Sequence, residues 1–295
     1  MPAPGPTDPT KLIAIPTHDG ELYGEVFMPS SITAGGSPKG IVVVTHGYAE
    51  HCGRYREVAN VIMQAGWAAL TYDVRGHGKS PGPRGYVGAF HEYTDDLFKV
   101  MKVARGLVPD PAPLVLLGHS HGSLITLRLA ISADVDGQFE LGEYAKAIIV
   151  SSPYLALRMV VPGWKKLLAK VASRIAPKLA QPNGIKAEQL THDKEMQRIH
   201  DADPLNFSVA TSRWFVESSK AQDEVAANAA RITLPSTWIV GADDPLTDPA
   251  QSKRVASSMK NAEYHELRGF LHEVFNEVDR AQPFELLTKT LAAIG

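Results

Sequence analysis

The chain has 295 residues, of which 44% are hydrophobic and 21% are charged, and its formal net charge is −2. This composition is that of a globular protein with a large core, and it excludes a chain that is mostly disordered. Because there is neither a basic excess nor an acidic tail, we expect no nucleic acid among its partners.

Cysteine content and apolar runs bear on the compartment. Cys52 is the single cysteine, so the chain can form neither an internal disulfide nor a cysteine-based metal site. The sequence lacks the basic and apolar segments of a signal peptide at its start. Its apolar runs also fall far short of the roughly 20 residues needed to span a bilayer. We therefore expect a soluble, cytoplasmic protein.

Short apolar runs alternate with helical stretches along most of the chain. Two N-terminal strands are expected at 11–15 and 22–28. Apolar runs without alternation suit strands that are covered on both faces, and strand–helix alternation favours parallel pairing. The sequence therefore predicts an α/β fold with a mostly parallel central sheet and helices on both faces. Further strands are predicted at 41–45, 68–72, 114–117, 147–150, 237–240 and 262–267, and helices at 55–65, 92–107, 121–133, 249–259 and 283–294.

This alternation stops between Val150 and Thr237, where no strand is evident. Helices are expected within this interval at 163–175 and 186–199, and proline-containing loops separate them. We interpret residues 152–213 as a helical cap that is inserted between two strands of the α/β core. The core would then consist of residues 1–151 and 214–295.

The candidate nucleophile is Ser120, the central residue of a G-x-S-x-G motif at Gly118–Gly122. An apolar strand runs into the motif and a helical stretch follows it, which is the context of a nucleophile elbow. The two glycines permit the close backbone approach that such a turn requires. The sequence therefore predicts that Ser120 stands at the end of a strand, with its hydroxyl available for attack on an acyl group.

A serine nucleophile needs N–H donors for the negative oxygen of its tetrahedral intermediate. We expect one donor to be the backbone N–H of His121, directly after the serine. The second donor should come from the loop after an early strand, and His46-Gly47-Tyr48 follows the strand at 41–45. We therefore predict that the Tyr48 backbone N–H completes the oxyanion hole.

The candidate base is His272, which lies in a loop after the last predicted strand. This is where a base should stand, at the carboxyl edge of the sheet, and the order in this fold is serine, acid, histidine. The other histidines that follow the nucleophile are less well placed: His192 and His200 fall in the predicted cap, and His265 falls inside a strand.

Three carboxylates that follow the strand at 237–240 compete for the role of the acid. Asp248 precedes a proline and a helix, so it is better assigned to an N-cap. Asp243 and Asp244 are neighbours, and their distance from the strand does not separate them. Whichever of the two is used, an ionised carboxylate would fix the tautomer of the base and stabilise its protonated form.

These motifs resemble the monoacylglycerol lipase and lysophospholipase group of the α/β-hydrolase superfamily, over roughly residues 20–290. The most specific part is the H-G-x-x-E-H-x-x-R-Y pattern at 46–55. Alignment with the G-x-x-D pattern of the family selects Asp244 as the acid. The resemblance implies a Ser120–Asp244–His272 triad, no cofactor and a helical cap that shapes an acyl-chain pocket. His121 departs from the family, in which methionine commonly follows the serine.

Several histidines near these motifs invite other readings. His119 and His121 flank a strand–helix turn and lack a third partner in sequence, so we expect no metal site there. We expect His46, His77 and His119 to be hydrogen-bonded framework residues rather than bases.

The stretch 163–175 is amphipathic, with Trp164, Leu167, Leu168 and Val171 on one helical face. Two interpretations are open. This face packs on the body of the protein, or it docks to a membrane or micelle while lysines meet anionic headgroups. The lysines are Lys165, Lys166 and Lys170.

The predicted function is hydrolysis of the carboxylic ester of a single-chain lipid, foremost monoacylglycerol, through an acyl-enzyme on Ser120. The expected partner is thus a small lipid ester. Alternatives are a lysophospholipase, a broad short-chain esterase and a peptidase acting on small acyl-amides. A binding protein on an inactive hydrolase fold is the alternative from another class. The sequence does not indicate the oligomeric state.

Overall fold

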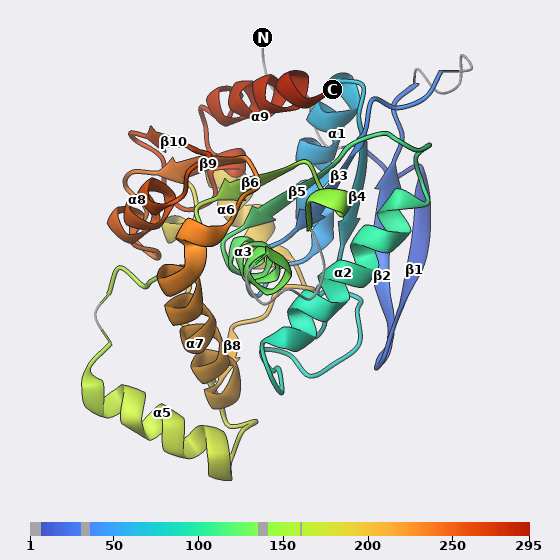
Figure 1. The fold of residues 1–295 in the computed structure, drawn as a ribbon. Helices are drawn as coiled ribbons and strands as arrows, with labels where there is room; N and C mark the ends of the chain where they lie inside the picture. The colour runs from blue at the N-terminus through green and yellow to red at the C-terminus, as the bar shows by residue number, and fades with distance from the viewer. Residues whose placement is uncertain (1–6, 31–35, 135–140, 160) are drawn as a thin grey trace.

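The computed structural model describes residues 7–30, 36–134, 141–159 and 161–295 (Figure 1). The strands of its central sheet are β1 (Lys11–Thr17), β2 (Gly20–Phe27), β3 (Ile41–Thr45), β4 (Ala68–Tyr72), β5 (Leu114–His119), β6 (Ala147–Ser151), β9 (Ser236–Gly241) and β10 (Ala262–Leu267). They lie in the order β1-β2-β4-β3-β5-β6-β9-β10. β2 pairs antiparallel with β1 and β4, and the other pairings in this sheet are parallel. The predicted α/β fold with a mostly parallel sheet is confirmed.

Helices cover both faces of the sheet, as Figure 1 shows. Along β3, Ile41 and Val43 belong to the core on one face, and Val42 and Val44 belong to the core on the other. This double burial explains why the strand is an unbroken apolar run. Burying one such side chain stabilises the fold by about 1.5–3 kcal/mol. The predicted helices are present as α1 (Arg56–Gln64), α2 (His91–Arg105), α3 (His121–Asp134), α8 (Pro249–Ser258) and α9 (Ala281–Ile294), and a short α4 (Leu141–Tyr144) precedes β6.

Between β6 and β9 the chain leaves the sheet. Its elements there are α5 (Gly163–Ile175), β7 (Ala180–Pro182), α6 (Lys194–Ala202), β8 (Val209–Thr211) and α7 (Ser212–Asn228). β7 and β8 form a small antiparallel pair. α7 packs against α3 on the body, and α5 packs against α7 at the far end of the molecule (Figure 1).

Two helices in this interval differ from the prediction. The prediction of a helix over 186–199 is wrong in its first half, because α6 begins only after Asp193. The Asp193 side chain caps this helix by accepting from the N–H groups of Glu195 and Met196. The seventeen-residue α7 was not predicted. Its buried face includes Glu217 and Ser218 beside apolar residues, so it lacks the apolar stripe that identifies a helix in sequence.

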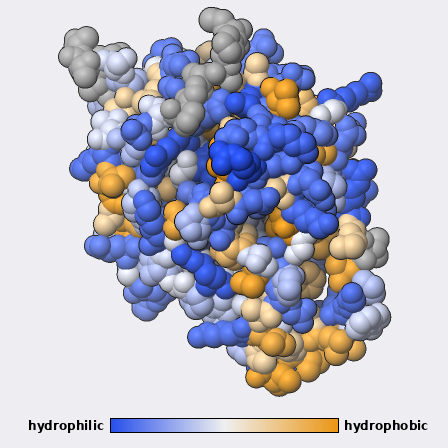
Figure 2. All heavy atoms as spheres, turned by 180° about the vertical axis from the view of Figure 1, so that it is seen from behind, coloured by the Kyte–Doolittle hydropathy of each residue, from blue (hydrophilic) through white to orange (hydrophobic). Residues whose placement is uncertain are grey.

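The apolar face of α5 points away from the protein. Trp164 and Leu167 are each 63% exposed, and Leu168 is 58% exposed. The interpretation that this face packs on the body is therefore wrong. The buried position of α5 is Ser173, whose carbonyl accepts from Arg213 of α7. The exposed apolar side chains gather in the orange region at the lower right of Figure 2. No helix in the described part of the chain is long and apolar enough to cross a membrane.

Candidate active site

Ser120 lies in a strained turn between β5 and α3. Its φ of 50° is in the left-handed region, which a residue with a side chain rarely adopts. The turn is held from both sides, because the Ser120 N–H donates to the Ser151 carbonyl at 2.9 Å and the Ser120 carbonyl accepts from the Tyr154 N–H at 3.0 Å. The surrounding backbone thus fixes the conformation that presents the hydroxyl.

The two glycines of the motif are required by close backbone contact. A Cβ on Gly118 would lie 2.6 Å from the Gly122 carbonyl oxygen, and a Cβ on Gly122 would lie 2.1 Å from that of Thr45. Both distances are far shorter than van der Waals contact. Any side chain at either position would therefore push α3 away from the ends of β3 and β5.

His272 and Asp244 are joined by a hydrogen bond of 2.7 Å between Nδ1 and Oδ2. Asp244 is completely buried, and it also accepts from the Thr247 hydroxyl at 2.6 Å and from the Thr247 N–H at 3.0 Å. Asp243 is exposed and accepts instead from the Gly269 N–H at 2.8 Å. Their distance from the strand did not separate Asp243 from Asp244 in the sequence. In the structure, Asp244 is the one that contacts His272. Asp248 caps α8, as predicted.

The electrostatics of this pair favour an ionised acid and a basic histidine. Burial alone would lower the pKa of His272, but the charge and hydrogen bond of Asp244 outweigh it and raise the pKa above its ordinary value of 6.5. Burial would likewise raise the pKa of Asp244, but the His272 charge and several hydrogen bonds hold it below its usual range. His272 is therefore a stronger base than a free imidazole.

The loop after β3 runs close to Ser120. A Cβ on Gly47 would lie 3.4 Å from the Ser120 Cβ. The Gly47 N–H already donates to Glu50 Oε1 at 2.6 Å, so it is occupied. His121 is the first residue of α3, and its N–H therefore has no acceptor within its own helix. The predicted donors of Tyr48 and His121 thus lie in two segments that flank Ser120.

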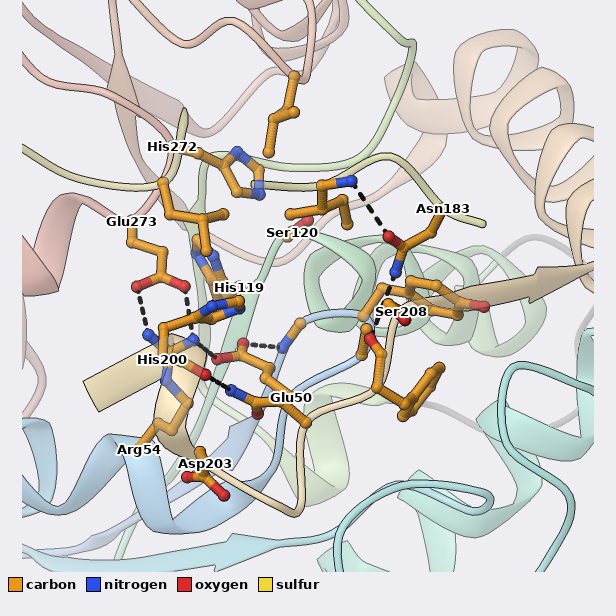
Figure 3. Close-up of a pocket in the computed structure, with 18 of the residues that line it drawn as sticks. Glu50, Arg54, His119, Ser120, Asn183, His200, Asp203, Ser208, His272 and Glu273 are labelled. Atoms are coloured by element: carbon orange, nitrogen blue, oxygen red, sulfur yellow. Dashed lines mark hydrogen bonds and ion pairs between the residues drawn. The ribbon is translucent and has the colours of Figure 1, made fainter. Parts of the chain in front are cut away.

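A cavity of about 260 Å³ opens over Ser120 and His272 (Figure 3). One wall is formed by the ends of the sheet, and the other by residues 183–208. The sheet wall includes Glu50, Arg54, His119 and Glu273, and the opposite wall includes Asn183, Ile185, Leu190, His200, Asp201, Asp203, Asn206, Phe207 and Ser208.

A buried ion-pair network on the sheet wall was missed in the sequence. Arg54 donates to both oxygens of Glu273, at 2.6 and 2.7 Å, and to Glu50 at 2.8 Å. Burial would raise the pKa of Glu273, but the charge of Arg54 lowers it to about 2. Glu273 follows His272 directly, so the network anchors the histidine loop to the segment after β3. Glu50 and Arg54 were visible in the H-G-x-x-E-H-x-x-R-Y pattern, but nothing in sequence indicated their partner.

The remaining histidines near Ser120 are framework residues, as predicted. His46 Nε2 accepts from the Val74 N–H at 2.9 Å, and His119 Nδ1 lies 3.0 Å from the Ser151 hydroxyl. Burial lowers the pKa of His46, His77 and His119 to about 3, so all three are neutral. Within the described ranges, no cluster of His, Cys, Asp or Glu side chains could hold a metal ion.

Known proteins resemble this chain in sequence and in fold. It is 28% identical over 253 residues to a phospholipase, YtpA, of Bacillus subtilis, which covers 84% of this chain and 93% of that protein. It is 30% identical over 249 residues to a monoacylglycerol lipase of Mycolicibacterium smegmatis, covering 82% and 84%. The crystal structure of a Paleococcus ferrophilus monoacylglycerol lipase matches with a TM-score of 0.80 at 27% identity, covering 93% and 100%.

A family model described as serine aminopeptidase, S33, matches residues 36–279. This range contains the strained Ser120 turn, the loop after β3 and the His272–Asp244 pair. The chain therefore belongs to the S33 family of α/β-hydrolases, and it is a serine hydrolase that acts on carboxylic esters.

Proposed function

We propose that this chain hydrolyses monoacylglycerols to a fatty acid and glycerol, with Ser120 as nucleophile, His272 as base and Asp244 as the acid. The observation that carries the proposal is the 2.7 Å contact of His272 with a buried Asp244, in the same cavity as the strained Ser120. The monoacylglycerol lipase from Mycolicibacterium smegmatis supports the substrate class.

The reaction would proceed in two halves. Ser120 Oγ attacks the ester carbonyl carbon while His272 takes its proton, and the carbonyl oxygen becomes negative opposite the N–H groups of Tyr48 and His121. The intermediate collapses as His272 returns the proton to the glycerol oxygen, which leaves. Water then attacks the acyl-enzyme by the same route and releases the fatty acid.

The charge of the cavity favours an uncharged headgroup over a phosphate. Arg54 is the single Lys or Arg among the described residues that line it, and its guanidinium is already bonded to Glu50 and Glu273. A phosphate would therefore meet carboxylates without a free cation. Asn206 lines the cavity, and its Oδ1 is buried and accepts no hydrogen bond from the described residues, so a glycerol hydroxyl can donate to it once the side chain turns toward the cavity.

We also propose that residues 152–213 act as a cap and that α5 docks to the lipid surface from which the substrate is taken. Trp164, Leu167 and Leu168 are exposed on one face. The helix carries four cations and no carboxylate, which is complementary to anionic headgroups. Flotation with anionic liposomes tests this surface: the wild type should float, and Trp164→Ser with Leu168→Ser should not. A wild-type protein that does not float with the liposomes at physiological salt would contradict the proposed docking.

A hydrolysis panel tests the proposed substrate. It contains monoacylglycerols of several chain lengths, lysophosphatidylcholine, di- and triacylglycerol, and short p-nitrophenyl esters. We expect the highest kcat/KM for a monoacylglycerol. A preference for lysophosphatidylcholine would identify a lysophospholipase and would place this chain nearer to the Bacillus subtilis relative, which is named a phospholipase. Activity confined to short esters would keep the triad and remove the lipid assignment.

A further inference from the structure

Trp214 contacts the side chains of both residues proposed as oxyanion donors. It lies in the first turn of α7 and is only 6% exposed. Its backbone N–H donates to the hydroxyl of Thr211, the N-cap residue of that helix. Thr211 is itself anchored to the body, because its N–H and its hydroxyl both donate to the Gly85 carbonyl, at 3.0 and 2.7 Å. The indole therefore has a fixed position next to the nucleophile turn.

The contact of Trp214 with Tyr48 is a ring stack. The ring centroids are 3.8 Å apart and the planes are inclined by 27°. The Tyr48 hydroxyl donates to the Val209 carbonyl at 2.8 Å, so the ring is held at its face and at its far end. Because the side chain is fixed in this way, the backbone at position 48 has little freedom to rotate its N–H.

The contact of Trp214 with His121 is a hydrogen bond. The indole Nε1–H donates to His121 Nε2 at 3.3 Å. His121 is completely buried, and burial holds the pKa of its imidazole far below the ordinary value, so the ring is neutral. Acceptance at Nε2 places the ring proton on Nδ1, which has no hydrogen-bond partner among the described residues. The bond to Trp214 is thus the polar contact that orients this ring.

A third neighbour of Trp214 holds the nucleophile itself. The Tyr154 ring lies parallel to the indole, with centroids 5.9 Å apart and planes inclined by 2°. The backbone N–H of Tyr154 donates to the Ser120 carbonyl at 3.0 Å. One rigid side chain therefore contacts three segments that surround the reacting serine.

We propose that Trp214 is a positioning residue of the oxyanion hole: its contacts with Tyr48 and His121 fix the separation and direction of their two backbone N–H groups. The inference rests on the proposed function, since it takes these groups as the donors. Trp214 is not among the described residues that line the cavity, so we expect no contact between it and the substrate. Its effect should therefore be felt in the transition state rather than in substrate binding.

Trp214→Phe tests the inference, because it retains an aromatic ring and removes the indole N–H. Trp238→Phe is the matched control: Trp238 is also buried, and its Nε1–H also donates a hydrogen bond, to the Ser236 hydroxyl at 3.0 Å, but on β9. We expect Trp214→Phe to lower kcat about tenfold with KM changed less than about twofold. Trp238→Phe should leave kcat unchanged, even if it lowers the unfolding midpoint of the protein as much as Trp214→Phe does.

A second pair of variants changes the acceptor of this hydrogen bond, His121. His121→Gln keeps an acceptor for the indole N–H, and His121→Met removes it. We expect His121→Gln to retain more of kcat than His121→Met. In the His121→Met background, Trp214→Phe should cause little further loss, because the bond is already absent.

Three results would overturn the inference: a kcat for Trp214→Phe as high as that of Trp238→Phe, a rise in KM with unchanged kcat, or additive losses in the double variant. The wild type separates this failure from that of the proposed function. A wild type that neither hydrolyses esters nor reacts with a fluorophosphonate would remove both. A reactive wild type with an unaffected Trp214→Phe would remove the positioning role alone.

Discussion

The two walls of the cavity differ in how their polar groups are satisfied. On the sheet wall the charged groups are buried and bonded to one another, as Arg54 is to Glu50 and Glu273. On the opposite wall, residues 183–208 are more open to water, and the buried Oδ1 of Asn206 accepts no hydrogen bond from the described residues.

This contrast separates chemistry from recognition. Leaving a buried polar group without a partner costs about 1–3 kcal/mol, so a fully bonded network has one strongly preferred arrangement. The sheet wall is therefore preorganised before substrate arrives. The opposite wall keeps bonding capacity that a ligand can use, and we expect changes there to alter selectivity more than turnover.

The largest effect should come from the sheet wall. Ser120→Ala removes the proposed attacking oxygen and His272→Ala removes the proposed base, so each should lower kcat roughly 10⁵-fold or more while the fold persists. Steady-state kinetics and the unfolding midpoint measure both quantities. His265→Ala is the control, because His265 lies in β10 beside Glu263 and should leave turnover unchanged. Appreciable activity in Ser120→Ala would mean that another nucleophile operates.

The next effect separates the two neighbouring aspartates. Asp244→Asn should lower kcat by about 10⁴-fold, because an amide cannot stabilise the protonated His272 or hold its tautomer. Asp243→Asn should change kcat little, since Asp243 is exposed and bonded to the Gly269 N–H. Steady-state kinetics of the two variants on the same ester decide which aspartate is the acid. The reverse ranking would move the acid by one residue.

Sequence predicted most of the fold because central strands of the sheet, such as Ile41–Thr45, are unbroken apolar runs, as burial on both faces requires. α7 was not predicted because the polar residues Glu217 and Ser218 interrupt the apolar pattern of its buried face. For α5, periodicity shows which residues share a face, but it is equally compatible with that face pointing inward or outward.

The candidate site was predictable to the extent that its motifs are local. The Ser120 turn follows from glycine spacing over a few residues. Sequence spacing did not separate Asp243 from Asp244, and the choice came from the family pattern, because their difference lies in how one loop folds against His272. The Arg54–Glu273 pair joins residues 219 positions apart, which no local pattern can reveal.

The third prediction concerns pH and tests how strongly the sheet wall tunes its base. Since Asp244 raises the pKa of His272 above 6.5, the histidine stays protonated, and inactive as a base, to a higher pH than a free imidazole. The acid limb of kcat/KM on an uncharged ester should therefore lie above pH 6.5. In Asp244→Asn the residual activity should show a limb at lower pH, because burial then acts without the opposing charge. A wild-type limb below 6.5 would contradict this tuning.

The smallest effect should come from the opposite wall. Asn206→Leu removes the unpartnered Oδ1, so it should lower kcat/KM for monoacylglycerol several-fold, as the loss of about 1 kcal/mol from one hydrogen bond implies. The methyl ester of the same fatty acid is the control substrate, since it has no glycerol hydroxyl to donate. Its kcat/KM should be unchanged by the substitution. Equal losses of kcat/KM on both substrates would indicate that Asn206 supports the wall through its 3.0 Å bond to the His200 carbonyl. The proposal that this wall recognises the substrate while the sheet wall is preorganised would then be wrong for Asn206.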